Sequence, residues 1–293
     1  MPVGGTGSVD VYDTARGTFT RVDGFQTAER QHDGKTRVVG PSAVSIGDGT
    51  AYVGNRATSE VCPIDTGTLE LGACLKLASP TDGVAFVAPA KEVWVTTPRD
   101  RSIAVLDAAS PGTLKAKTVI RLDGEPEGYA VDVSRGLFFT NLEDQNKTVV
   151  IDIRSHRPVA TWSLDCDAKG PRGIAVDSRG LVFAACTDHV TVLDGQHEGA
   201  ALGRVDTGAG VDNIDWFEPG HSLYVAAGAS RRLTVARIDD RGRATVVAVG
   251  TSVEGARNGV VDSEGNAYVA DPANARLLIF RYIVAAPSGV TTK

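Results

Sequence analysis

The amino-acid sequence predicts an all-β protein, and both its composition and its strand pattern support this. Glycine is abundant, with 33 copies, while methionine occurs once. Runs of helix-favouring residues are scarce, and stretches rich in valine and threonine alternate with turn residues. The chain of 293 residues is 42% hydrophobic, which is enough for a large core, and all-β domains of this length are often single. We therefore expect one domain over residues 1–293.

A repeated phrase predicts the architecture. Its clearest copy is a short apolar strand at 172–176, a polar turn at 178–180 and a second apolar strand at 181–185. A spacing of roughly 40–45 residues, with four short strands in each unit, is typical of a β-propeller. Related copies place the first, inner strand of each unit near residues 44, 84, 129, 174, 214 and 259.

The later strands of each unit change in character. The second strand is apolar, the third ends in an acid as at Asp107, and the fourth is more polar, as at 117–121 and 158–162. Inner strands are covered on both faces by neighbouring blades, whereas the outer strand is an edge that tolerates charge. The acid after the third strand is expected to accept backbone N–H groups in a turn.

The number of blades follows from the six inner strands. We prefer six four-stranded blades, with seven as the alternative. Residues 9–13 resemble a third strand and 18–22 a fourth, so we expect an N-terminal strand to close the ring. One strand is then left over, and a seven-bladed parent would explain it. The polar stretch 26–35 is interpreted as a loop, and 276–282 as the last strand.

Several of these strands resemble a known family. The second strands Tyr52-Val53-Gly54-Asn55 and Phe138-Phe139-Thr140-Asn141, with a following strand such as 148–152, are similar to YVTN-type β-propeller repeats. This resemblance implies an exported bacterial or archaeal protein. The last two second strands end differently, at 226–228 and 270–272, and resemble the broader group that includes NHL and gluconolactonase-like propellers.

Net charge, the lengths of apolar runs and the N-terminal residues indicate which partners and which compartment to expect. The formal net charge is −6 with both signs mixed, so no basic stripe predicts nucleic-acid binding. No apolar run approaches the ~18 residues of a membrane span. Residues 1–5 lack the features of a signal peptide. Together with the family resemblance, this leads us to expect a periplasmic or extracellular protein whose signal peptide is absent from this sequence.

The four cysteines are compatible with disulfides in an oxidising compartment. Cys166 precedes an inner strand and Cys186 ends the second strand of the same unit, so antiparallel pairing would bring them together. Cys62 and Cys74 flank one hairpin and are a second candidate pair. Buried thiols in strands remain the alternative.

The residues that begin the inner strands form the candidate site. In a propeller they would ring the channel mouth, together with loops that join strands two and three. Opposite charges there could simply neutralise one another. The alternative is a ligand-binding site at the channel mouth, made of Asp82, Glu127, Arg172, Asp212, Asn213, Arg257 and Asn258.

A divalent cation is one possible ligand of this mouth. Oxygen ligands could hold Ca²⁺ or a similar ion, and the gluconolactonase-like resemblance implies such a metal in the channel. The two arginines instead suit a carboxylate or phosphate. Of the histidines, only His189 is expected on the mouth side, so a histidine-bound metal or a Ser/His/Asp triad is not predicted. The candidate metal ligands are Asp82, Glu127, Asn213 and Asn258.

These observations favour an exported, non-enzymatic binding or scaffold propeller that acts through its charged mouth. The expected partner is a protein or a small polar ligand, and the expected state is a monomer. The alternative function is a metal-assisted hydrolase or lactonase of the gluconolactonase-like type.

Overall fold

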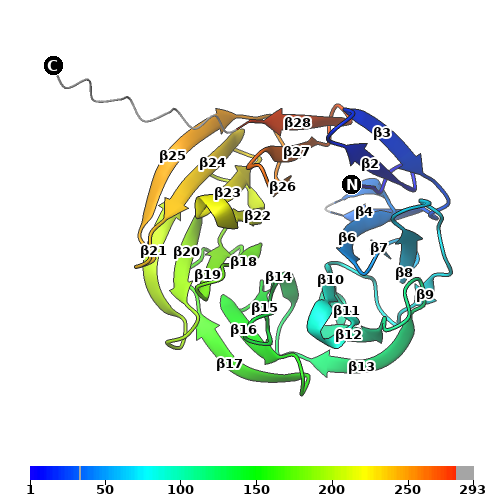
Figure 1. The fold of residues 1–293 in the computed structure, drawn as a ribbon, viewed down its shortest axis with the longest axis horizontal. Coiled ribbons are helices and arrows are strands. Elements are labelled where there is room, and N and C mark those ends of the chain that lie inside the picture. Colours follow the sequence, from blue (N-terminus) through cyan, green and yellow to red (C-terminus); the bar gives the residue numbers. More distant parts are fainter. Residues whose placement is uncertain (33, 282–293) are drawn as a thin grey trace. The chain divides into compact units, whose positions relative to one another are not determined.

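The computed structural model describes residues 1–32 and 34–281, which divide into two compact units, Met1–Pro171 and Arg172–Lys293. The described strands form seven antiparallel sheets and one separate two-stranded hairpin, and in every sheet the strands are neighbours in sequence order (Figure 1). Such meanders are the blades of a β-propeller, and they number seven. The prediction of a β-propeller is confirmed, while the preferred count of six is wrong and the alternative of seven is correct.

The first unit contains four of these sheets. The β4–β5 hairpin lies between the first and second sheets in the sequence. In chain order, the strands are β1 (Pro2–Val3), β2 (Ser8–Asp13), β3 (Thr18–Val22), β4 (Ala28–His32), β5 (Lys35–Val39), β6 (Pro41–Gly47), β7 (Thr50–Asn55), β8 (Glu60–Asp65), β9 (Leu75–Lys76), β10 (Val84–Val87), β11 (Glu92–Thr97), β12 (Ser102–Asp107), β13 (Lys115–Arg121), β14 (Pro126–Asp132), β15 (Leu137–Leu142), β16 (Lys147–Asp152) and β17 (Arg157–Ser163).

The second unit contains three sheets, and the last has three described strands. Short 3₁₀ turns punctuate both units: η1 (Ala88–Ala90), η2 (Pro98–Asp100) and η3 (Glu218–Gly220). The strands of the second unit are β18 (Ile174–Val176), β19 (Leu181–Ala185), β20 (His189–Asp194), β21 (Ala200–Asp206), β22 (Val211–Phe217), β23 (Ser222–Ala227), β24 (Arg232–Ile238), β25 (Ala244–Thr251), β26 (Gly259–Val261), β27 (Ala267–Asp271) and β28 (Arg276–Phe280).

Burial changes across each blade as the sequence predicts. All six residues of the second strands β7, β11 and β23 are buried, whereas the outer strand β13 exposes six of its seven residues. Four blades also carry a register shift where the third strand meets the outer strand, as between Val105 and Leu106. Such a bulge adds local twist to an outer edge.

The predicted turn after the third strand is confirmed. The Asp65 carboxylate accepts the backbone N–H groups of Gly67 and Thr68, both at 2.8 Å. Asp107 accepts from Ala109 at 2.9 Å in the corresponding turn of the next blade. The hydrogen bonds from Thr68 and Gly67 lower the pKa of Asp65, because they stabilise the ionised form.

Apolar side chains between neighbouring blades form the core of each unit. In the first unit, Trp94 of β11 is 1% exposed and packs on Phe138 of the next blade with ring centroids 4.7 Å apart. In the second unit, Phe183 of β19 stacks on Trp216 of β22 at 4.7 Å. Blades therefore hold one another by side-chain packing, as expected for a repeat fold in which each unit covers its neighbour.

The N-terminal strands, the 26–35 segment and the last strand differ from what the sequence predicts. β1 was not predicted, and it pairs with β2 to give the N-terminal strands a sheet of their own. Residues 26–35, interpreted as a loop, contain part of the β4–β5 hairpin. The last strand ends at Phe280, and Tyr282 lies outside the described residues. Ring closure by an N-terminal strand and the single-domain boundary remain predictions.

All four cysteines are disulfide-bonded. Cys62 and Cys74 are joined across the hairpin that follows β8, as the sequence suggested. Cys166 and Cys186 are also oxidised, which agrees with their prediction as disulfide residues. Disulfides persist mainly in oxidising compartments. No helix within residues 1–32 and 34–281 is long and apolar enough to cross a membrane.

Candidate functional site

The mouth side of a blade is defined here by two loops, the one before its first strand and the one between its second and third strands. In the first unit, Asp82 lies before β10, and its carboxylate is ion-paired with the guanidinium of Arg56, which follows β7. Glu127 lies in β14 opposite Asn141, beside a register shift, and is half-buried. The predicted acid Asp82 is therefore already neutralised by a neighbouring blade.

In the second unit, the predicted mouth residues approach one another. The Nε of Arg257 lies 3.3 Å from the Oδ2 atom of Asp212, and the backbone N–H of Asn213 donates to the Arg257 carbonyl at 3.2 Å. Arg172 donates its backbone N–H to the carbonyl of Ala185 at 2.6 Å. Asn258 is exposed, and its carbonyl accepts a backbone N–H from β27. Asp212 and Asn213 are thus bound to Arg257 of the next blade, whereas the backbone contacts of Arg172 and Asn258 stay within their own blades.

These contacts bear on the predicted metal ligands. The side-chain oxygen of Asn213 accepts the N–H of Ile214 at 2.9 Å, and an oxygen of Asp82 faces Arg56. Within the described residues, the only cluster of three or more acidic, histidine or cysteine side chains close enough to share a metal ion is Glu60, Cys62 and Cys74. Its two sulfur atoms are bonded to each other, so it offers no thiolate pair.

Loops between strands two and three carry further ion pairs on the mouth side. Arg101 lies 3.2 Å from Asp144 of the next blade, and Arg231 lies 2.7 Å from Glu254. Most of these side chains are more than half exposed, which limits the energy of each pair. Together they give the mouth side mixed, locally balanced charge.

His189 lies on the mouth side, as predicted. Its Nδ1 is 2.5 Å from the Asp188 carboxylate, and this hydrogen bond is the main reason that the pKa of Asp188 is lowered. The ring is 4% exposed, and its Nε2 has no hydrogen-bond partner among the described residues. His156 and His197 lie in turns at the other end of the strands, in agreement with the expectation that only His189 is on the mouth side.

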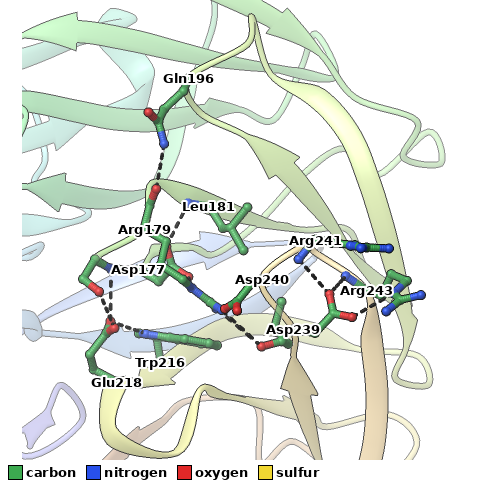
Figure 2. Close-up of polar contacts among 12 residues, drawn as sticks. Asp177, Arg179, Leu181, Gln196, Trp216, Glu218, Asp239, Asp240, Arg241 and Arg243 are labelled. Carbon is green, nitrogen blue, oxygen red and sulfur yellow. Dashed lines mark hydrogen bonds and ion pairs between the residues drawn. The ribbon is translucent and has the colours of Figure 1, made fainter.

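Sequence reasoning missed a polar network at that opposite end of the second unit. Figure 2 shows Arg179 between two acids, with Nε 2.7 Å from Asp177 and Nη1 2.9 Å from Asp240. Its guanidinium also lies 5.8 Å from the centroid of the Trp216 ring. The ring nitrogen of Trp216 donates to Glu218 at 2.6 Å. This network joins the turns of two adjacent blades.

Asp215 was also missed; it lies in the inner strand β22, between Ile214 and Trp216. Its carboxylate accepts the N–H of Val261 from the next blade at 2.7 Å and that of Trp216 at 2.9 Å. Burial raises its pKa despite these hydrogen bonds. Asp215 lines a cavity of about 10 Å³ between β22 and β26. A volume of that size holds roughly one water molecule, far below the ~300 Å³ of a small-molecule site.

The β4–β5 hairpin adjoins the mouth side of the β6–β9 blade. Its base is held by the Asn55 side chain, which donates to the Gln26 carbonyl at 3.0 Å, and by Arg30, whose Nη2 lies 3.2 Å from the Ala57 carbonyl. Asn55, the last residue of β7, and Ala57 flank Arg56 in the sequence. A hairpin signal was present in the Asp33-Gly34 dipeptide, but the flanking strands lack apolar alternation.

Comparison with solved structures supports the fold assignment. A chain of hydrazine synthase from Kuenenia stuttgartiensis has a TM-score of 0.77 at 16% identity, covering 95% of this chain and 90% of that one. A chain in the crystal structure of the mitotic checkpoint complex has a TM-score of 0.74 at 12% identity, covering 96% and 83%. These identities support the propeller fold alone. No family model and no curated protein matches the sequence.

Proposed function

We propose that this β-propeller is an exported, non-enzymatic binding or scaffold protein that contacts a protein partner through its mouth side. We also propose that its strands are YVTN-type repeats, and this resemblance is consistent with an exported binding or scaffold protein.

The observation that carries the proposal is the pairing of mouth-side charges. Arg56–Asp82, Arg101–Asp144 and Asp212–Arg257 each join neighbouring blades or the loops between them. A general base or a cation site needs a carboxylate whose oxygens are available to substrate or metal. These acids instead face guanidinium groups. Charges held in place by a rigid scaffold supply orientation and specificity to a protein interface.

Two further features support this role. The described cavity beside Asp215 is too small for a substrate. The oxidised state of all four cysteines suits an exported protein, and we place it in the periplasm or outside the cell.

A photo-crosslinking experiment tests the proposal. A crosslinking amino acid replaces Arg99, an exposed residue of the loop between β11 and β12. The matched control replaces Arg154, an exposed arginine in the turn between β16 and β17 at the opposite end of a blade. We expect the same protein adduct from extracellular or periplasmic fractions at position 99 and little at position 154. Equal labelling at both positions would contradict the proposal.

Calorimetry with Ca²⁺, Mn²⁺ and Zn²⁺ addresses the hydrolase alternative. Micromolar binding that is lost in Asp82→Asn, together with turnover of a lactone, would replace the binding proposal by the metal-assisted one.

A further inference from the structure

The β4–β5 hairpin places two arginines directly opposite each other. In its register, Arg30 pairs with Arg37, flanked by the pairs Ala28–Val39 and His32–Lys35. Residues in such pairs share one face of the hairpin, with Cβ atoms roughly 5 Å apart. Like charges in this position destabilise a hairpin. The face that contains Arg30 and Arg37 is called the basic hairpin face below.

The described residues do not neutralise this face. Arg37 is exposed, and neither Arg30 nor Arg37 forms an ion pair with a described carboxylate. The one acid of β4, Glu29, lies opposite Val38 and therefore belongs to the other face. On that other face, Gln31 donates to the Thr36 hydroxyl at 2.7 Å.

The hairpin also has unpaired edges. It is a sheet of two described strands, so each strand has an edge whose backbone groups lack a ladder partner. Neither strand packs extensively against another described element. A two-stranded hairpin is only marginally stable in water by itself. An extended segment of another chain can pair with such an edge and add main-chain hydrogen bonds.

We propose that the basic hairpin face and its adjoining strand edge bind an acidic segment of a partner protein in extended conformation. A carboxylate of that segment would reach the exposed Arg37 guanidinium, which can bind a carboxylate in a bidentate manner. Arg30, directly opposite, adds positive charge to the same face while its Nη2 stays on the Ala57 carbonyl. This inference rests on the proposed function, since it names the chemistry of the partner for a feature anchored at the mouth side.

The small size of the face favours a protein segment over other anions. Nucleic-acid binding commonly uses several phosphate contacts and extended basic surfaces, whereas this face is built around one pair of arginines. A free small anion would need enclosure, and an exposed hairpin face offers little. A short acidic strand matches both the charge and the edge.

A direct binding assay tests the proposal with a fluorescein-labelled peptide of eight alternating glutamate and valine residues. Fluorescence anisotropy is recorded with the full chain at 50 mM and 300 mM salt. We expect saturable binding that weakens with salt, and none of a lysine–valine peptide. Absence of binding to the acidic peptide, or equal binding of both peptides, overturns the inference.

The key variant is Arg37→Glu, because it replaces the repulsion within the like-charge pair by an attraction between Arg30 and the introduced carboxylate. The hairpin should therefore stay folded, with amide exchange at residues 28–31 and 36–39 as slow as in the wild type or slower. Affinity for the acidic peptide should nevertheless fall at least tenfold. Arg154→Glu, an equal change of charge at the opposite end of a blade, should leave affinity unchanged. Equal affinity in the Arg37→Glu variant overturns the inference.

Two further results would assign a different occupant. Binding of a single-stranded DNA or heparin fragment, but not of the peptide, in an Arg37-dependent way would replace the acidic protein segment by a polyanion. Self-association of the unlabelled chain that is lost in Arg37→Glu would identify a second copy, and the inference would again be wrong. The crosslink at position 99 tests the mouth side separately from the hairpin. If position 99 gives the specific protein adduct but the acidic peptide does not bind, only the hairpin inference is rejected.

Discussion

The carboxylate of Glu92 lies 3.0 Å from the Nε2 atom of His156, which belongs to the next blade. Glu92 is 1% exposed and also accepts from the Trp94 ring nitrogen at 2.7 Å and the Lys117 ammonium at 2.6 Å. Burial alone would raise the pKa of Glu92, but the hydrogen bonds from Lys117, Trp94 and His156 outweigh it and lower the pKa. One buried acid therefore joins two blades.

This arrangement predicts an acid-sensitive contribution to stability. Because the folded-state pKa of Glu92 lies below its ordinary value of 4.5, its contribution is complete above that value and is lost as pH falls through the folded-state pKa. Glu92→Gln should lower the free energy of unfolding by about 2 kcal/mol at pH 7. The difference from wild type should shrink below pH 4.5.

Urea unfolding between pH 3 and pH 7 provides the measurement. Glu198→Gln is the control, since Glu198 is exposed and should change stability by less than about 0.5 kcal/mol. A Glu92→Gln effect that is the same at every pH would show that the hydrogen bonds do not depress this pKa.

Much of the fold could be predicted because the same strand pattern recurs along the chain. Each of the six predicted inner strands lies at its expected position, and the turn aspartates accept the expected backbone N–H groups. The blade count failed at β1 (Pro2–Val3), whose two residues are too short to show any periodicity. The β4–β5 hairpin was missed because its strands are polar, so only the Asp33-Gly34 turn signal marked it.

The site was predicted less well than the fold. Position in the repeat correctly put Asp82, Asp212 and Arg257 at the starts of inner strands, but it could not show that each acid would pair with an arginine of an adjacent blade or loop. Such pairs depend on side-chain directions between blades. Arg179 and Asp215 were not singled out, since Arg179 lies in an ordinary turn and Asp215 lies beyond the strand-start positions that the repeat marks.

Arg179 should contribute measurably to the contact between two blades. It is 22% exposed, bonds to Asp177 and Asp240, and covers the Trp216 ring. Arg179→Ala should therefore lower the free energy of unfolding by about 2 kcal/mol. Arg241→Ala is the matched control in the neighbouring turn of Figure 2, where only the backbone N–H is bound to Asp239. Chemical denaturation measures the free energy of unfolding of both variants. An equal decrease in the two variants would contradict a specific role of Arg179.

The Cys62–Cys74 disulfide should stabilise the fold by restricting the unfolded chain. The bond joins residues 12 apart, for which loop-closure entropy predicts about 3 kcal/mol. A double variant, Cys62→Ala with Cys74→Ala, isolates this bond because it leaves Cys166 and Cys186 unchanged. Urea denaturation should show that the free energy of unfolding falls by this amount, with a lower urea midpoint. Mass spectrometry of non-reduced wild-type peptides should recover residues 62 and 74 in one linked species, and free thiols at these positions would contradict the structure.

Gly47 should be required for close packing between the β6–β9 and β10–β13 blades. A Cβ atom added there would overlap the ring of Phe86. That ring is stacked on Tyr52 with centroids 5.7 Å apart, so it has little room to move. Gly47→Ala should therefore destabilise the protein by about 1–3 kcal/mol, the usual cost of overpacking.

Two variants keep the Gly47 prediction specific. Gly5→Ala is the control, because no atom lies within 4 Å of an added Cβ at that position, and it should leave the melting temperature nearly unchanged. A second change, Phe86→Leu, removes part of the overlap in the Gly47→Ala background and should recover some of the lost stability. Additive losses from the two changes would mean that Gly47 and Phe86 act independently, since contacting residues are expected to couple in a double-mutant cycle.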